Sequence, residues 1–168
     1  MDADEFETFV RESAPALRRY ARAVTADPGQ AEELLQQTYV RMATAWHGPL
    51  AGGGPLASAK VTMVRLHVGR LRTIARWVRS VAAARTPVGA DQVDQVADGQ
   101  LRRLLAGLAP LQRVVLVMTY LDDLDDESIA AAIGRRPGTV RSLRHRALGI
   151  VRAGLPTARV RPEMEAAG

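Results

Sequence analysis

Apolar residues recur at the spacing of an α-helix along almost the whole chain, and this pattern limits the fold more than any other feature. The clearest stretch lies in residues 31–46, where one helical face collects Ala31, Leu34, Leu35, Thr38, Met42, Ala45 and Trp46. Apolar residues make up 47% of the chain but aromatic residues only 4%. Because β-sheets favour β-branched and aromatic side chains, the sequence predicts an all-α fold.

Capping residues and helix breakers divide the N-terminal part. Ser13, a good N-cap residue, stands two positions before Pro15, so we expect one helix to end and another to begin there. Asp27 before a proline predicts the start of the helix that carries residues 31–46. The glycine-rich residues 48–55 predict a loop, and a third long helix is expected after it.

The chain is expected to form two small helical domains joined by a linker. Residues 85–98 have no apolar stripe and contain proline and glycine, which is typical of a linker. We expect one domain over residues 1–84 and a second over residues 99–155. Residues 156–168 are expected to form a disordered tail.

Four short helices are expected in the second domain, over residues 101–108, 110–121, 126–133 and 137–153. For the last two, Asp125 can cap the first helix, Gly134 can supply the turn, and Pro137 can begin the second. This arrangement is typical of a helix-turn-helix. Apolar residues are expected to face its core, namely Ile129, Ala130, Ile133, Val140, Leu143, Ala147 and Val151.

The last helix would present cations and hydrogen-bonding groups where a recognition helix meets DNA bases. These residues are Arg136, Thr139, Arg141, Ser142, Arg144 and His145. We expect Arg144 to touch bases, and Arg152, near the far end, to touch the phosphate backbone or solvent. The alternative is a helical hairpin with a solvated basic face.

Cations are unevenly distributed along the chain, whose net charge is +5. Residues 1–59 carry five basic and eight acidic side chains. Residues 60–85 carry seven cations, residues 135–152 carry six, and neither block contains an acid. Since a solvated helix face usually mixes the two signs, the acid-free blocks favour two contacts with a polyanion.

Residues 101–152 resemble region 4 of the sigma-70 family of RNA polymerase sigma factors. The resemblance rests on Leu108-Ala109-Pro110 with Gln112-Arg113, Tyr120-Leu121, Ile129-Ala130, Gly134, Gly138-Thr139-Val140-Arg141-Ser142 and Arg146-Ala147. Residues 6–24 and the stretch AEELLQQTYVRMATAW are similar to region 2 of the same family. Both regions in this order, with little between them, resemble the ECF (extracytoplasmic function) group.

The resemblance implies RNA polymerase core and promoter DNA as partners. Polymerase would be bound by the second helix, through Glu32, Glu33, Leu35, Gln36 and Gln37. The third helix would hold and melt the −10 promoter element, through Arg65, His67, Arg70, Arg72 and Arg76. The helix-turn-helix would read the −35 element. ECF factors commonly have an anti-sigma factor, so such a partner is also implied.

The chain departs from the family pattern at some of these positions. Arg65 stands where the family often has Asn, and Trp77 is the one aromatic residue within the third helix. Arg136 stands where a helix-capping Ser is common. Leu143-Arg144 reverses the more usual polar-then-apolar order. These departures bear on which promoter is recognised and how strongly it is melted.

No enzyme, cofactor or metal site is expected. The chain has no cysteine, His47, His67 and His145 lack metal-ligand spacing, and residues 52–54 lack the Lys and Ser/Thr of a phosphate-binding loop. The acids in residues 122–127 are interpreted as a turn and a helix N-terminus, where negative charge is favourable.

A cytoplasmic protein is expected. No apolar run approaches the roughly 20 residues of a membrane span, and the N-terminus is acidic, unlike a secretion signal. Two alternatives to a sigma factor stay open. One is a DNA-binding regulator of another class that uses only the helix-turn-helix. The other is a degenerate sigma factor, an interaction module that does not open promoters.

Overall fold

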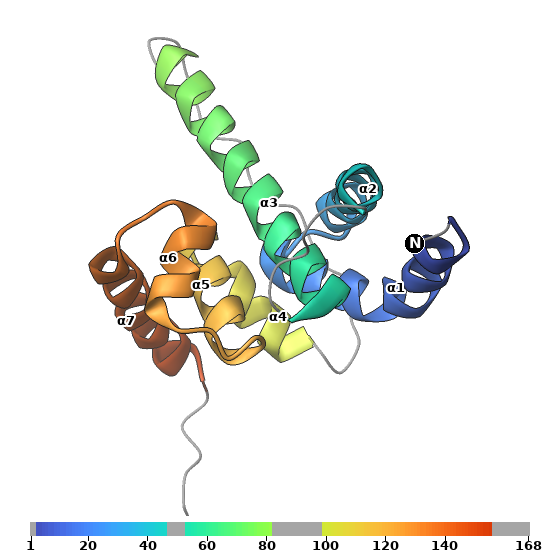
Figure 1. Cartoon of the computed structure of the whole chain (residues 1–168). Helices are drawn as coiled ribbons and strands as arrows, with labels where there is room; N and C mark the ends of the chain where they lie inside the picture. The colour runs from blue at the N-terminus through green and yellow to red at the C-terminus, as the bar shows by residue number, and fades with distance from the viewer. Residues whose placement is uncertain (1–2, 47–52, 82–98, 156–168) are drawn as a thin grey trace, which may run out of the picture.

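The computed structural model describes residues 3–46, 53–81 and 99–155, which contain seven α-helices and no strand (Figure 1). The predicted all-α fold is therefore confirmed. Helices α1–α3 form an N-terminal half and helices α4–α7 a C-terminal half. The expected linker and tail lie outside the described residues. The domain boundaries that we placed beside them stay a prediction.

α1 (Ala3–Thr25) is one continuous helix with Pro15 inside it, so the expected break near Ser13 is wrong. A proline inside a helix removes one backbone hydrogen bond. Packing compensates, because Leu17 and Val24 of α1 are fully buried. The hydroxyl of Ser13 lies 3.1 Å from that of Tyr39 on the next helix, so Ser13 joins two helices instead of capping one.

α2 (Pro28–Ala45) begins where the sequence predicts. The carboxylate of Asp27 accepts a hydrogen bond from the backbone N–H of Gln30 at 2.7 Å, which satisfies one free donor of the first turn. α3 (Gly54–Val81) begins within the glycine-rich residues 48–55, for which the sequence predicts a loop. Its first half packs into the body of the molecule, and its second half projects away from it (Figure 1).

The C-terminal half follows the expected order, with α4 (Gly99–Ala106), α5 (Pro110–Tyr120), α6 (Asp126–Ile133) and α7 (Pro137–Gly154). The last two helices form the predicted helix-turn-helix. Asp125 accepts a hydrogen bond from the backbone N–H of Ser128 at 2.8 Å and so caps α6. Gly134 ends α6 with φ 62° and ψ 49°, a left-handed conformation that glycine adopts without strain.

The two halves share one hydrophobic core. Its fully buried members come from both sides, namely Leu17, Val24, Met63, Val64, Val114, Val115, Ile129, Ile133 and Val140. Helix α1 packs on α5, and α3 packs on α5 and α6. The first half of α3 is therefore held between the remaining N-terminal helices and the helix-turn-helix.

Candidate functional site

Most predicted recognition residues lie on the exposed side of α7. Arg136, Thr139, Arg141, Ser142 and His145 are all exposed. Arg136 is the N-cap residue, but its side chain makes no capping hydrogen bond. The predicted inward residues lie opposite, with Val140 and Ala147 fully buried. This helix therefore offers a cationic and hydrogen-bonding face at the surface of the helix-turn-helix.

Arg144 differs from its neighbours on α7. Its guanidinium donates to both carboxylate oxygens of Asp126 in the first turn of α6, and the hydrogen bonds to this carboxylate raise the pKa of Arg144. Arg141 lies 3.7 Å from the same carboxylate. Arg144 therefore points toward α6 in this structure, whereas the sequence predicts a contact with DNA bases, which stays a prediction.

The predicted −10 cations on α3 fall into two groups. Arg65 and Arg76 are exposed. Arg70 forms an ion pair with Glu33 of α2 at 2.8 Å, and Arg72 donates to the backbone oxygen of Ile133 at the end of α6. Two of the four predicted arginines, Arg70 and Arg72, are therefore already paired within the protein.

The turn of the helix-turn-helix makes room for Arg72. The backbone oxygen of Gly134 is a second acceptor for this side chain, at 3.4 Å. A Cβ at Gly134 would lie 2.5 Å from Nη2 of Arg72, closer than any contact allows. The left-handed turn favours glycine at position 134, and a larger residue there would also require the Arg72 side chain to shift.

His67 does not reach the surface in this arrangement. Only 3% of it is exposed, and its buried Nε2 has no hydrogen-bond partner among the described residues. Burial, and then the positive charges of Arg113 and Arg70, lower the pKa of His67 to about 4. The side chain is a neutral part of the interface between the halves, so the expected contact with DNA would require the halves to separate.

The expected polymerase patch on α2 is polar except for one member. Glu32, Glu33, Gln36 and Gln37 are exposed, whereas Leu35 is 3% exposed and belongs to the core. Leu35 therefore supports this surface from below and does not line it. Glu32 pairs with Arg18 of α1 at 3.2 Å, and Gln37 donates to Glu33 at 3.2 Å.

Comparison with known proteins agrees with this geometry. A family model described as "Sigma-70, region 4" matches residues 98–149. The RNA polymerase sigma-E factor of Streptomyces avermitilis is 36% identical over 154 residues, which cover 90% of this chain and 85% of the relative. The ECF RNA polymerase sigma factor SigL of Mycobacterium tuberculosis is 32% identical over 153 residues, 86% of this chain and 85% of the relative. The chain belongs to the ECF sigma factors.

A solved structure shares the fold of this ECF sigma factor. It is the sigma factor RpoE in complex with the anti-sigma factor NepR from Bartonella quintana, with a TM-score of 0.67, over 94% of this chain and 100% of that chain. The two sequences are 20% identical, so this likeness concerns the fold. As a sigma factor, the protein directs transcription, and the regulator of another class is set aside.

Sequence reasoning missed a polar cluster that joins the halves of the sigma factor. The hydroxyl of Tyr20 on α1 donates to Asp122 at 2.5 Å, and Lys60 on α3 donates to the same carboxylate at 2.6 Å. The Lys60 ammonium also lies 5.1 Å from the centre of the Tyr20 ring. Burial, followed by the hydrogen bond to Asp122, raises the pKa of Tyr20. These residues are 40 to 102 positions apart, so no local pattern could have grouped them.

Arg113 is a second missed residue of this interface. It is 7% exposed, and burial lowers its pKa. Its guanidinium donates to the backbone oxygens of Leu105 at 2.7 Å, Leu108 at 3.0 Å and Thr25 at 2.9 Å. Since Thr25 ends α1, this one cation ties the C-terminal end of α1 to the loop between α4 and α5.

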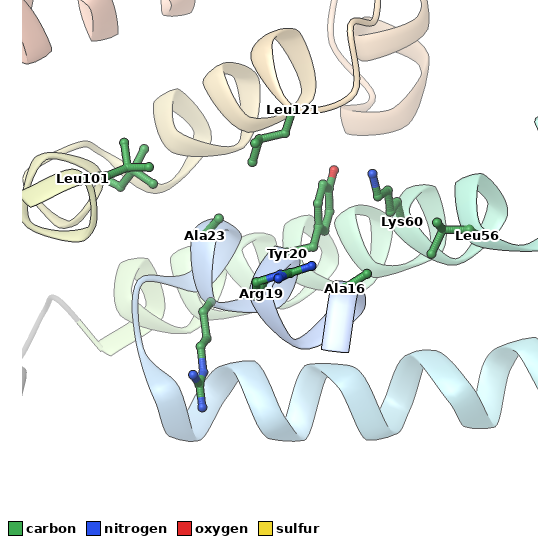
Figure 2. Close-up of a pocket in the computed structure, with 10 residues that line it drawn as sticks. Ala16, Arg19, Tyr20, Ala23, Leu56, Lys60, Leu101 and Leu121 are labelled. Atoms are coloured by element: carbon green, nitrogen blue, oxygen red, sulfur yellow. The ribbon is translucent and has the colours of Figure 1, made fainter. Parts of the chain in front are cut away.

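A groove of about 400 Å³ lies beside the Tyr20 cluster, between α1, α3, α4 and α5 (Figure 2). Four leucines line it, namely Leu56, Leu101, Leu105 and Leu121, together with the cations Arg19, Arg22 and Lys60. The groove is therefore both apolar and basic. Among the described residues, no cluster of acids and histidines could hold a metal ion. None of the described helices is long and apolar enough to cross a membrane.

Proposed function

We propose that this sigma factor binds core polymerase through α2, holds the −10 element with α3 and reads the −35 element with α7. The observation that carries the proposal is that the exposed cations form separate surfaces on α3 and α7, while the acidic and amide side chains lie on α2. One protein with these three surfaces could connect a protein partner to two sites on DNA.

The α2 surface suits a cationic partner helix. Glu32, Glu33, Gln36 and Gln37 cover about two turns, and Leu35 beneath them anchors α2 in the core. Carboxylates and amides on a rigid helix can accept hydrogen bonds from arginines with little loss of conformational entropy. Glu33 is already paired with Arg70, so polymerase binding at this residue would also act on α3.

The projecting half of α3 suits a melted promoter strand. Arg76 and Arg79 supply cations for the phosphate backbone, and Trp77, 64% exposed, offers a ring on which an unstacked base could stack. Arg65 lies in the other half of the helix and is also exposed. We propose that Arg70 and Arg72 contact DNA only after their present partners release them, and His67 only after the two halves separate.

On α7, the exposed Thr139, Arg141, Ser142 and His145 are proposed to face the −35 element in the major groove. The protein itself would carry out no chemistry, use no cofactor and act in the cytoplasm, where polymerase works. An anti-sigma factor, as in the solved complex of the RpoE relative, is proposed as a regulatory partner. The leucines and cations of the groove in Figure 2 would suit an amphipathic, acidic segment of such a partner.

The decisive experiment measures binding to purified core polymerase, and run-off transcription with it. It compares wild type with a Glu33→Arg, Gln36→Arg double variant. The two added arginines should repel a basic partner helix, so we expect core affinity to fall at least tenfold, equivalent to about 1.4 kcal/mol. The control is Thr8→Arg, Glu12→Arg, which adds the same charge at exposed positions of α1.

Equal losses in the variant and its control would indicate a general charge effect and would remove the support for α2 as the polymerase surface. If the wild-type protein binds core polymerase and yet gives no transcript from any promoter in a random library, the protein is the interaction module considered above.

A further inference from the structure

Arg144 lies on the inner flank of α7 instead of the outer face. It is four residues after Val140 and three before Ala147, and both of these are fully buried. Residues three or four apart share a helix face, so the stem of Arg144 starts from the core side of the helix. Only 25% of its side chain is exposed. A base edge could recruit this guanidinium only by displacing it from the protein.

Asp126 holds Arg144 in a two-point ion pair between the helices of the helix-turn-helix. Two guanidinium nitrogens of Arg144 donate to the two carboxylate oxygens, and 15% of the Asp126 side chain is exposed. Paired arginine and carboxylate groups of this geometry are among the stronger hydrogen-bonded contacts in proteins. Removing one partner would leave the other partly buried charge without compensation.

Arg141 is the second cation beside this carboxylate, but it is held loosely. Its Nη1 lies 3.7 Å from Oδ2 of Asp126, outside hydrogen-bonding distance, and 63% of its side chain is exposed. Because Arg141 makes no hydrogen bond to Asp126 and most of its side chain is exposed, it can extend toward solvent at little cost. One acid of α6 therefore holds Arg144 by two hydrogen bonds and Arg141 only by a longer contact.

We propose that Asp126 is a positioning residue for −35 recognition, which holds Arg144 away from DNA and thereby leaves Arg141 to read a base. This inference rests on the proposed function of α7. It assigns the arginine–guanine contact to Arg141 and a role between the helices to Arg144. It also makes the acid of α6 a determinant of sequence preference, although Asp126 itself touches no DNA.

Single substitutions should disturb base preference in two different ways. In Arg144→Leu, the unsatisfied Asp126 carboxylate would capture Arg141, and discrimination at one −35 position should fall roughly tenfold. In Asp126→Asn, Arg144 is released and can reach a phosphate, so binding should become less selective and the salt slope steeper by about one unit.

The double variant Asp126→Leu, Arg144→Leu distinguishes positioning from direct reading. An apolar pair replaces the ion pair, which proteins often tolerate without loss of stability. Arg141 then has no acid beside it, and we expect base preference to return to within about twofold of wild type. If Arg144 itself read a base, the double variant would keep the loss seen in Arg144→Leu.

The measurement is selection from a promoter library randomised over the −35 element, with full-length protein on core polymerase, at two salt concentrations. Glu127→Gln is the matched control, because it removes a charge from the same exposed first turn of α6 without touching Arg144. Its base preference should equal that of wild type. Thermal unfolding of each variant separates lost folding from lost reading.

Failure of this inference and failure of the proposed function give different results. Wild type that selects no −35 sequence would overturn the assignment of α7 to that element. Wild type that selects a sequence, with the double variant no better than Arg144→Leu, would overturn the role of Asp126 alone.

Discussion

Helices α3 and α7 carry most cations of the two acid-free blocks, and the cations on the two helices have different partners. On α3, Arg70 and Arg72 reach other elements, a carboxylate of α2 and backbone oxygens at the end of α6. On α7, Arg141 and Arg144 share one acid from within the helix-turn-helix. A stretch without acids in the sequence is therefore not a surface without acids, because the fold brings them from elsewhere.

The surfaces of α3 and α7 also differ in their availability to DNA. The outer face of α7 is exposed while the halves are packed together, whereas α3 packs against α1, α2, α5 and α6, and its residue His67 is buried. We expect the −35 surface to bind DNA in this arrangement, and the −10 surface to depend on how firmly the halves are joined.

Arg113 should have the largest effect on that joining. Arg113→Met removes a guanidinium that satisfies buried oxygens on both halves, and each such oxygen left unpaired costs about 1–3 kcal/mol. We expect the free energy of unfolding to fall by about 3 kcal/mol or more, measured by urea denaturation. Arg22→Met, an exposed cation near the end of α1, should change it by less than about 0.5 kcal/mol. Similar losses in the two variants would mean that Arg113 does not hold the halves together.

His67 should make the packing of the two halves, and with it the free energy of unfolding, sensitive to pH. Its pKa is about 4 in the folded protein, below the ordinary value of 6.5, so between these values the unfolded chain binds the extra proton. The stabilisation that depends on a neutral His67 is therefore fully present above pH 6.5, and it is lost as the pH falls toward 4. Between pH 7 and pH 5 the loss should be about 2 kcal/mol.

The pH effect of His67 can be isolated with His67→Gln, which cannot titrate. The difference between the unfolding free energies of wild type and variant should narrow by about 2 kcal/mol from pH 7 to pH 5. A constant difference between wild type and His67→Gln would show that His67 is not kept neutral by the interface.

Local signals explain how much of the fold could be predicted. Asp27, Asp125 and Gly134 act within three or four residues of their own positions, and each does what its residue type predicts. The prediction of a helix break at Ser13 is wrong because the contacts that keep α1 continuous come from other helices. Helix propensity is a weak signal that tertiary packing overrides.

The candidate site was less predictable, because its contacts join distant residues. The pairing of Arg144 with Asp126 spans 18 positions and depends on the angle between α6 and α7. The burial of His67 depends on how the two halves pack. Arg65 and Arg76 on α3, in contrast, are exposed, as the expected contact with DNA requires. Residue type and spacing predicted which helices carry charge, but not which charges remain free.

The smallest expected effects concern one exposed cation on each helix, Arg152 on α7 and Arg76 on α3. Arg152 lies in the last turn of α7, beyond the residues that could reach base edges, so any DNA contact it makes should be to a phosphate. Arg152→Ala should therefore weaken binding about equally on all sequences and lower the salt slope by about one unit.

On a short duplex that carries only a −35 element, Arg76→Ala on α3 should leave the salt slope of binding unchanged. With core polymerase and a complete promoter, both variants should lower it, because both helices then contact DNA. A lower slope for Arg76→Ala on the short duplex would show that α3 binds double-stranded DNA without opening it, and the functional difference between the two helices would disappear.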